Sequence, residues 1–242
     1  MIGIKASRRK AGKDEAEKPF WISFSDLMTA LMVLFLVAMA VALIAVTHGL
    51  TTIGQEAKKR DEAIALCRAD VKLLTEQKEF KGVTFRGNTI DFGRLATFSV
   101  NQHAFENIEH AHFVRKFVPQ VLKLARGENC DKWIKRVVVE GFASREGEAG
   151  YLYNLNLSYL RSQRVLCALL DSKAPYALEE RDRKLVQTLF LVGGSSFKST
   201  TGNVENDRRV ELTLEFRDLD KDKDKLTEIP LDPGLKCPND LR

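Results

Sequence analysis

Asp26 is an acid at the start of a long apolar run. From Leu27 to Val46 the only polar side chain is that of Thr29. An acid within a membrane span costs roughly 2.5–3.5 kcal/mol on insertion scales, so such residues usually face a partner or a water-filled path. Low dielectric favours the neutral carboxyl group, which lets an acid hold a proton and release it when its surroundings change. The residues therefore predict an ion-translocating site at Asp26.

The element that must position Asp26 is a membrane-spanning helix over residues 20–46. About 20 apolar residues at ~1.5 Å each cross the ~30 Å hydrocarbon layer. The alternatives are a buried core helix, for which the run is too long, and a signal peptide, for which no A-x-A-like cleavage site follows. A third alternative is an interfacial Asp26 that reaches lipid headgroups. Phe20 and Trp21 precede it by about a turn, which places it below the interface.

The flanks of the span predict its orientation. Six basic residues precede it, and none follows before Lys58. Because basic flanks stay cytoplasmic, we expect a single-pass inner-membrane protein with a cytoplasmic N-terminus and a periplasmic C-terminal part. The sequence pI of about 9.0 does not indicate nucleic-acid binding, since the densest basic cluster is this 1–19 tail.

All four cysteines follow the span, which suits an oxidising compartment and disulfides. Strand 136–141 and the helix after it should pack antiparallel, which would bring Cys167 level with Cys130. A Cys130–Cys167 bridge is therefore predicted. Two pairings remain for the other cysteines. Cys67 and Cys237 would form a disulfide within one chain, or Cys67 would form a disulfide with Cys67 of a second chain in a dimer. The cysteines and histidines lack zinc-ligand spacing, so we expect no metal and no cofactor.

Residues 47–80 read as a helical linker with apolar residues on a three-four spacing: Ile53, Ala57, Ile64, Cys67, Val71 and Leu74. This seam fits a parallel helix pair or a helix that lies against its own domain, and the sequence favours neither. The folded domain is expected over residues 81–217, followed by a low-complexity tail over residues 218–242, whose end Cys237 ties down.

The domain has recognisable element patterns. A hairpin turns at Gly87-Asn88, a helix covers about 102–125, and strand 136–141 has the continuous β-branched run of a sheet interior. A helix over 154–170, a strand over 185–194 and an alternating strand over 208–216 follow. In the first helix we expect burial of Phe105, Ile108, Phe113, Phe117, Val121 and Leu124. The fold class is a single N-terminal transmembrane helix plus an α+β domain of order β(β)–α–β–α–β–β.

The basic tail, the aromatic pair and the run D-L-M-T-A-L-M from Asp26 resemble the span of the MotB family, the B subunits of ion-driven flagellar stators. The resemblance implies that Asp26 carries the translocated ion. The Thr-Ala pair that begins at Thr29 is more similar to proton-using members of the family than to sodium-using ones. The resemblance therefore implies a proton as the translocated ion, with sodium as the alternative. It also implies a homodimer inside a ring of membrane A subunits, two B to five A.

Residues 141–165 and 206–212 resemble the OmpA-like peptidoglycan-binding signature. The resemblance implies an OmpA-like domain, peptidoglycan as its partner, and a set of ligand-binding residues: Ser144, Glu146, Tyr153, Asn154, Leu157, Arg161, Asp207 and Arg208. A forked guanidinium at Arg161 suits the carboxylate of a diaminopimelate residue, and Asn154 suits its peptide amides. Both are expected to be exposed near the start of the helix, so that their substitution weakens binding without lowering the melting temperature.

One position departs from the signature. Ser144 stands where the family has the acid that binds the ammonium group, and the loop is about two residues longer. Either Glu146 or Asp207 replaces that acid, or the ammonium contact is lost.

The competing classes are a passive OmpA-like anchor, which needs no buried acid, and a TolR- or ExbD-like transducer, which lacks the outer signature. A flagellar stator B subunit commonly has a longer linker. The short linker and the cysteines make the chain most similar to the B subunits of Zorya anti-phage systems. No enzyme is predicted, because the sequence has no nucleophile–base pattern, phosphate loop or metal ligand set.

Overall fold

The computed structural model describes residues 17–144, 150–196 and 207–219 together with Cys237. The chain divides into two compact units, and the boundary between them lies between Glu56 and Ala57. Nearly all of the predicted 1–19 tail and most of the predicted 218–242 tail lie outside the described residues.

The first unit is the N-terminal part of α1, a helix that runs from Glu17 to Thr75. Its large apolar side chains are exposed on all sides, for example Leu34, Phe35 and Ile44. An isolated helix that is apolar all round is stable in hydrocarbon rather than in water. Among the described residues, α1 contains the one helical stretch long and apolar enough to cross a membrane.

The part of α1 that belongs to the second unit packs on the domain. Ile64, Cys67, Val71 and Leu74 are all buried, and the last three join the hydrophobic core. The predicted seam is therefore used within the chain from Ile64 onward, and the helix lies against its own domain. The compact unit begins at Ala57, earlier than the predicted domain boundary at 81.

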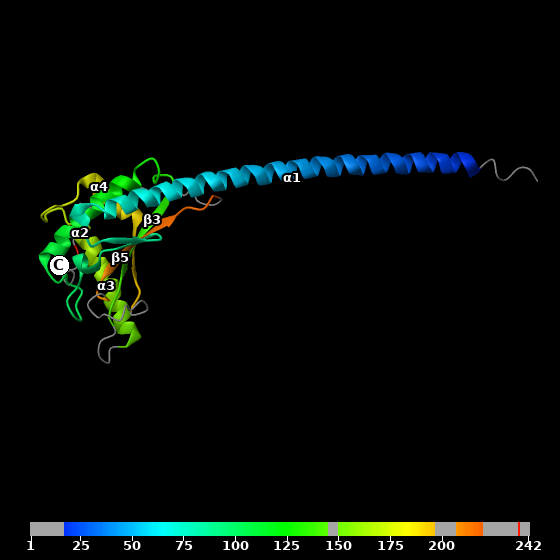
Figure 1. The fold of residues 1–242 in the computed structure, drawn as a ribbon. Helices are drawn as coiled ribbons and strands as arrows, with labels where there is room; N and C mark the ends of the chain where they lie inside the picture. The colour runs from blue at the N-terminus through cyan, green and yellow to red at the C-terminus, as the bar shows by residue number, and fades with distance from the viewer. Residues whose placement is uncertain (1–16, 145–149, 197–206, 220–236, 238–242) are drawn as a thin grey trace, which may run out of the picture. The chain divides into compact units, whose positions relative to one another are not determined.

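The described residues of the second unit form a five-stranded sheet in the spatial order β1-β2-β5-β3-β4. The strands are β1 (Thr84–Arg86), β2 (Thr89–Asp91), β3 (Ile134–Gly141), β4 (Phe190–Gly194) and β5 (Val210–Phe216). The pair β3–β4 is parallel and the other pairs are antiparallel. Figure 1 shows β3 and β5 side by side in this sheet. The predicted interior position of the 136–141 strand is confirmed.

The predicted hairpin is also confirmed. Strands β1 and β2 are joined by Gly87-Asn88, and Gly87 has φ 63°. A positive φ at the first residue of a two-residue loop is what a type II′ turn requires, and glycine adopts it without strain.

One face of the sheet carries the core. Ile90 pairs with Leu212, which pairs with Val139, and all three side chains are buried. The residues between the buried ones in β5, such as Thr213, point to the other face of the sheet; they are half-buried and mostly polar. This alternation is typical of an antiparallel sheet covered by helices on one face.

Helix α2 (Ile108–Ala125) begins later than the predicted residue 102. The side chain of Asn107 caps it by accepting the backbone N–H of His110. Ile108 then lies in the exposed first turn, so its predicted burial is wrong. Phe117 and Val121 are buried as predicted, whereas Phe105, Phe113 and Leu124 are partly buried against the core.

Helix α3 (Tyr151–Leu170) agrees with the prediction, and α4 (Glu180–Leu189) was not predicted. The predicted strand 185–194 is wrong for residues 185–189, which are helical. Asp182, Val186 and Leu189 are buried at a spacing of three and four residues, and acids occupy the first helical turn. Strand β4 starts only at Phe190, where pairing with β3 begins.

All four cysteines form disulfides, but the predicted pairing is wrong. Cys67 is bonded to Cys130 and Cys167 to Cys237. The prediction considered only how far along the helix axis Cys167 lies. It ignored the direction in which the side chain points around that axis. Cys167 is two residues, or about 200°, from both Val165 and Leu169, which α3 buries, so it faces away from the core. Cys67 lies on the buried side of α1 and reaches Cys130 instead.

Candidate ion-carrying and ligand-binding sites

The first candidate site is Asp26, which lies in α1 in the segment with exposed apolar side chains. Thr29 lies three residues on and therefore on the same helix face. Its hydroxyl donates to the backbone oxygen of Ser25 at 2.7 Å, within its own helix. Asp26 is the one ionisable residue between Ser25 and Val46, a position at which an acid usually faces a partner or a water-filled path.

The second candidate site is centred on Arg161 in α3. Its guanidinium group donates to three backbone oxygens: Nη1 to Phe142 at 2.7 Å, Nε to Gln102 at 3.1 Å and Nη2 to Ser99 at 3.2 Å. Phe142 follows β3, whereas Ser99 and Gln102 belong to the loop over residues 97–107. Arg161 therefore joins two segments that are far apart in sequence.

The expectation that Arg161 and Asn154 are exposed is wrong. Arg161 is 1% exposed and Asn154 is 2% exposed. The Nδ2 group of Asn154 donates to the backbone oxygen of Gly150, within the first turn of α3. A buried cation needs hydrogen-bond acceptors, and three backbone oxygens accept from the guanidinium group of Arg161.

Buried serines lie at the end of β3 and next to α3. Ser144 is buried, and Ser196 is fully buried with φ 53°, a backbone conformation that is strained for serine. The backbone N–H of Ser196 donates to Oγ of Ser158, and its backbone oxygen accepts from the N–H of Ala143. These two bonds join Ser196 to α3 and to Ala143, the residue before Ser144.

Close packing explains the motif glycine. A Cβ atom on Gly141 would lie 2.0 Å from the backbone oxygen of Ser158, so only glycine allows α3 to pass this close to β3. Gly194, which pairs with Gly141 in the sheet, has the same role, since its Cβ would lie 2.6 Å from Oγ of Ser158. Of the other predicted residues, Leu157 is buried and Tyr153 is 49% exposed.

The run before β5 completes the described part of the site. Arg208 is buried and its Nε donates to the backbone oxygen of Phe98, at the start of the same 97–107 loop. Arg209, which the sequence-based site omits, lies 3.8 Å from Asp207 and 2.7 Å from Glu211. Asp207 is thus next to a cation within the chain. Glu146, the other candidate acid, lies outside the described residues.

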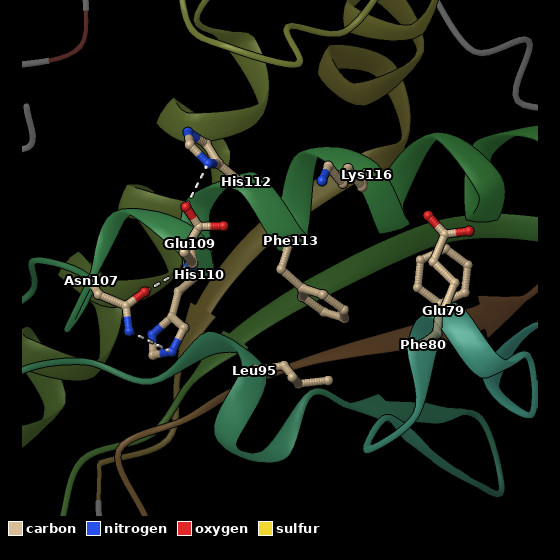
Figure 2. A pocket seen from close by; sticks show the side chains of 9 residues that line it. All are labelled: Glu79, Phe80, Leu95, Asn107, Glu109, His110, His112, Phe113 and Lys116. Carbon is tan, nitrogen blue, oxygen red and sulfur yellow. Dashed lines mark hydrogen bonds and ion pairs between the residues drawn. The ribbon is translucent and has the colours of Figure 1, made fainter.

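A separate pocket of about 400 Å³ lies along α2 (Figure 2). Phe113, Phe80 and Leu95 give it an apolar lining, the last two from the short 3-10 helices Lys78–Phe80 and Gly93–Ala96. Figure 2 shows the ion pair between His112 and Glu109, which measures 3.3 Å. None of the predicted ligand-binding residues lines this pocket, so it is distinct from the site around Arg161. No group of His, Cys, Asp or Glu among the described residues could hold a metal ion.

Comparisons with known proteins relate the chain to a family, to solved structures and to one relative. Residues 5–47 match the family described as membrane MotB of the proton-channel complex MotA/MotB. Among solved structures, the periplasmic domain of Helicobacter pylori MotB is 12% identical, with a TM-score of 0.41 over 57% of this chain and 83% of that one. The OmpA-like domain of FopA1 from Francisella tularensis subsp. tularensis SCHU S4 is 20% identical, with a TM-score of 0.35 over 56% and 82%.

One relative matches nearly the whole sequence, the Zorya protein ZorB of Escherichia coli O139:H28 (strain E24377A / ETEC). It is 40% identical over 237 residues, which are 96% of this chain and 95% of the relative. The matched MotB family is described as part of a membrane proton-channel complex and not as an enzyme, in agreement with the prediction for this chain. At this identity over nearly the whole sequence, the chain belongs to the ZorB family of Zorya proteins.

Proposed function

We propose that this chain is the peptidoglycan-anchored subunit of an inner-membrane motor that is driven by ion flow and serves anti-phage defence. Asp26 carries the ion, and Thr29 lies beside it on the same helix face. The C-terminal unit holds the subunit to the cell wall. The N-terminus is cytoplasmic, because the basic residues precede the span.

The observation that carries the proposal is the acid in the apolar stretch of α1. Asp26 is a lone ionisable side chain next to about 20 apolar residues, and it falls within the segment that matches the MotB description. A cell-wall anchor needs a membrane tether but has no use for an acid there, which costs free energy. A protein that moves an ion across the membrane needs one.

The motor requires partners. An exposed helix with one acid forms no ion path by itself, so further membrane helices must surround Asp26. We propose a homodimer of this chain inside a ring of five membrane subunits, as in the stators that its span resembles. The proton is the proposed ion, since a single carboxylate with a threonine neighbour offers few oxygen ligands for a dehydrated sodium ion.

The test is Asp26→Asn in cells that carry the complete defence locus, with phage plaque formation as the readout. The substitution keeps the size of the side chain and removes its negative charge, so protection is expected to be lost. Glu56→Gln, which removes an exposed acid of α1 outside the apolar run, is the matched control and should protect as wild type does. Protein level and co-purification with the partner subunit establish that both variants assemble.

Full protection by a normally assembled Asp26→Asn variant would contradict the motor and leave a passive anchor. The ion itself is tested by infection in medium in which potassium replaces sodium. Protection should persist if protons drive the motor, and its loss would assign sodium.

A further inference from the structure

His48 lies two residues beyond the end of the apolar run of α1. Between Asp26 and Glu56 it is the only residue with an ionisable side chain. The apolar run therefore has one titratable group near each end, since Asp26 comes directly before it and His48 shortly after it. In the proposed orientation, with the basic tail in the cytoplasm, His48 is at the periplasmic end of the span.

The two groups lie on the same face of one helix. Helix α1 is continuous from Glu17 to Thr75, so each residue adds about 100° of rotation all the way from Asp26 to His48. The step of 22 residues between them makes six full turns and about 40° more, with a rise of about 33 Å. A face that presents Asp26 to a partner subunit therefore presents His48 to the same partner at the other end of the span.

Apolar residues separate the two groups on this face. Val33, Val37 and Ile44 lie between them, and their side chains are exposed. Because an apolar side chain neither accepts nor donates a proton, protons that travel from His48 to Asp26 need water or polar groups of partner helices along this face. His48 has a proton path to serve only in the assembled complex, so the complex is what the test must use.

The imidazole of His48 is the proton-exchanging side chain at this end of the span. The hydroxyl group of Thr47 donates to the backbone oxygen of Leu43 at 2.9 Å. The hydroxyl group of Thr51 donates to the backbone oxygen of His48 at 2.8 Å, so both threonines are bonded within their own helix. The His48 side chain is exposed, and an imidazole gains and loses a proton near neutral pH, which a threonine hydroxyl does not.

We propose that His48 collects protons from the periplasm and passes them to the path that leads to Asp26. One ring nitrogen of the neutral imidazole accepts a proton from periplasmic water, and the other nitrogen releases its own proton to a water molecule at the entrance of the path. The ring is then neutral again with the roles of its nitrogens exchanged, and rotation of the side chain restores the first state. The inference rests on the proposed proton-driven motor and adds a second proton-carrying residue to it.

The test measures proton uptake after an acid pulse, with a pH-sensitive fluorescent protein in the cytoplasm of cells that contain the complete complex. His48→Gln keeps a polar side chain but cannot carry a proton. Uptake should fall about a hundredfold, the lower end of what a positioned proton-transfer group contributes. Imidazole added to the medium should restore uptake in this variant and add little to that of wild type, because a mobile buffer replaces the missing ring.

Asp26→Asn, measured in parallel, separates the two levels of the proposal. If wild type and Asp26→Asn take up protons equally, the proposed motor itself fails. If uptake depends on Asp26 and His48→Gln takes up protons as wild type does, the motor stands and the inference about His48 is wrong.

A relocated histidine distinguishes a proton path from a merely interfacial role. Leu50 is 64% exposed and lies two residues after His48, about 200° around the helix and about 3 Å further along it. His48→Gln combined with Leu50→His keeps a histidine at the outer boundary but on the face opposite Asp26, so uptake should stay as low as in His48→Gln alone. Full uptake by this double variant would show that the face is irrelevant and would overturn the proposal. Co-purification with the membrane subunits establishes that each variant assembles.

Discussion

Cys67 of α1 is bonded to Cys130, in the turn that connects α2 to β3, across a sequence separation of 63 residues. Both residues are buried, and Cys67 lies among the apolar residues with which α1 packs on the core. The bond therefore fastens the end of the helix that contains the membrane span to the domain proposed to hold the cell wall. It also uses Cys67 within the chain, so this cysteine cannot join two chains.

Removal of this bond should destabilise the second unit. Closing a loop of this length contributes about 4 kcal/mol in the chain-entropy model, so Cys67→Ser with Cys130→Ser should lower the free energy of unfolding by about that amount. Denaturant unfolding of the full-length protein in detergent measures the loss. Wild type unfolded under reducing conditions, which also breaks Cys167–Cys237, should be at least as unstable as the double variant.

The same pairing makes a prediction for electrophoresis. Wild-type protein isolated from the envelope should run as a monomer on a non-reducing gel, and peptide mapping should recover Cys67 linked to Cys130. A covalent dimer that disappears in Cys67→Ser would contradict the pairing.

The parts of the fold that the sequence predicted are those whose pattern depends on local neighbours. The β-branched run of β3, the alternation of β5 and the glycine turn between β1 and β2 were all recognisable. By contrast, residues 185–189 are apolar enough for a strand and lie in α4, because only Phe190 and its successors reach β3. The boundary between α4 and β4 therefore depends on pairing with another strand, and the local sequence pattern does not predict it.

Two glycines set how closely α3 approaches the sheet. Gly141→Ala and Gly194→Ala should each lower the free energy of unfolding by about 3 kcal/mol, since a Cβ would overlap backbone or buried side-chain atoms that cannot move away. Thermal unfolding of the full-length protein measures the effect. Gly193→Ala is the control, because its Cβ would lie 3.9 Å from Val138 in ordinary contact. Equal stability of the three variants would mean that α3 does not approach the sheet this closely.

The sequence predicted the position of Asp26 better than the surroundings of Arg161. The position of Asp26 follows from composition alone, since hydrophobicity determines where the span lies. The burial of Arg161 could not be predicted in this way, because a motif specifies residue types and not which segments fold over them. The 97–107 loop, which supplies two of the three acceptors of Arg161, contributes no residue to the signature, so sequence comparison gave no reason to include it.

Glu211 occupies the middle of a row of acids on the polar face of the sheet. It pairs with Asp91 of β2 on one side and with Glu140 of β3 on the other. Burial raises the pKa of the Glu211 carboxyl group above its ordinary value, and the two neighbouring acids add to this. The hydrogen bond and charge of Arg209 oppose the rise.

This raised pKa predicts a fall in stability with rising pH. The folded chain keeps the proton on Glu211 at pH values above 4.5, the ordinary value, at which the unfolded chain has begun to release it. The free energy of unfolding therefore decreases as pH rises from there through the folded-state pKa. Glu211→Gln cannot titrate and should flatten this part of the profile, measured by denaturant unfolding at a series of pH values. Glu180→Gln is the control: a hydrogen bond from Lys184 lowers the pKa of Glu180, so its contribution has the opposite sign and its removal should leave the fall in place. An unchanged slope in Glu211→Gln would show that the pKa of Glu211 is not raised in the folded chain.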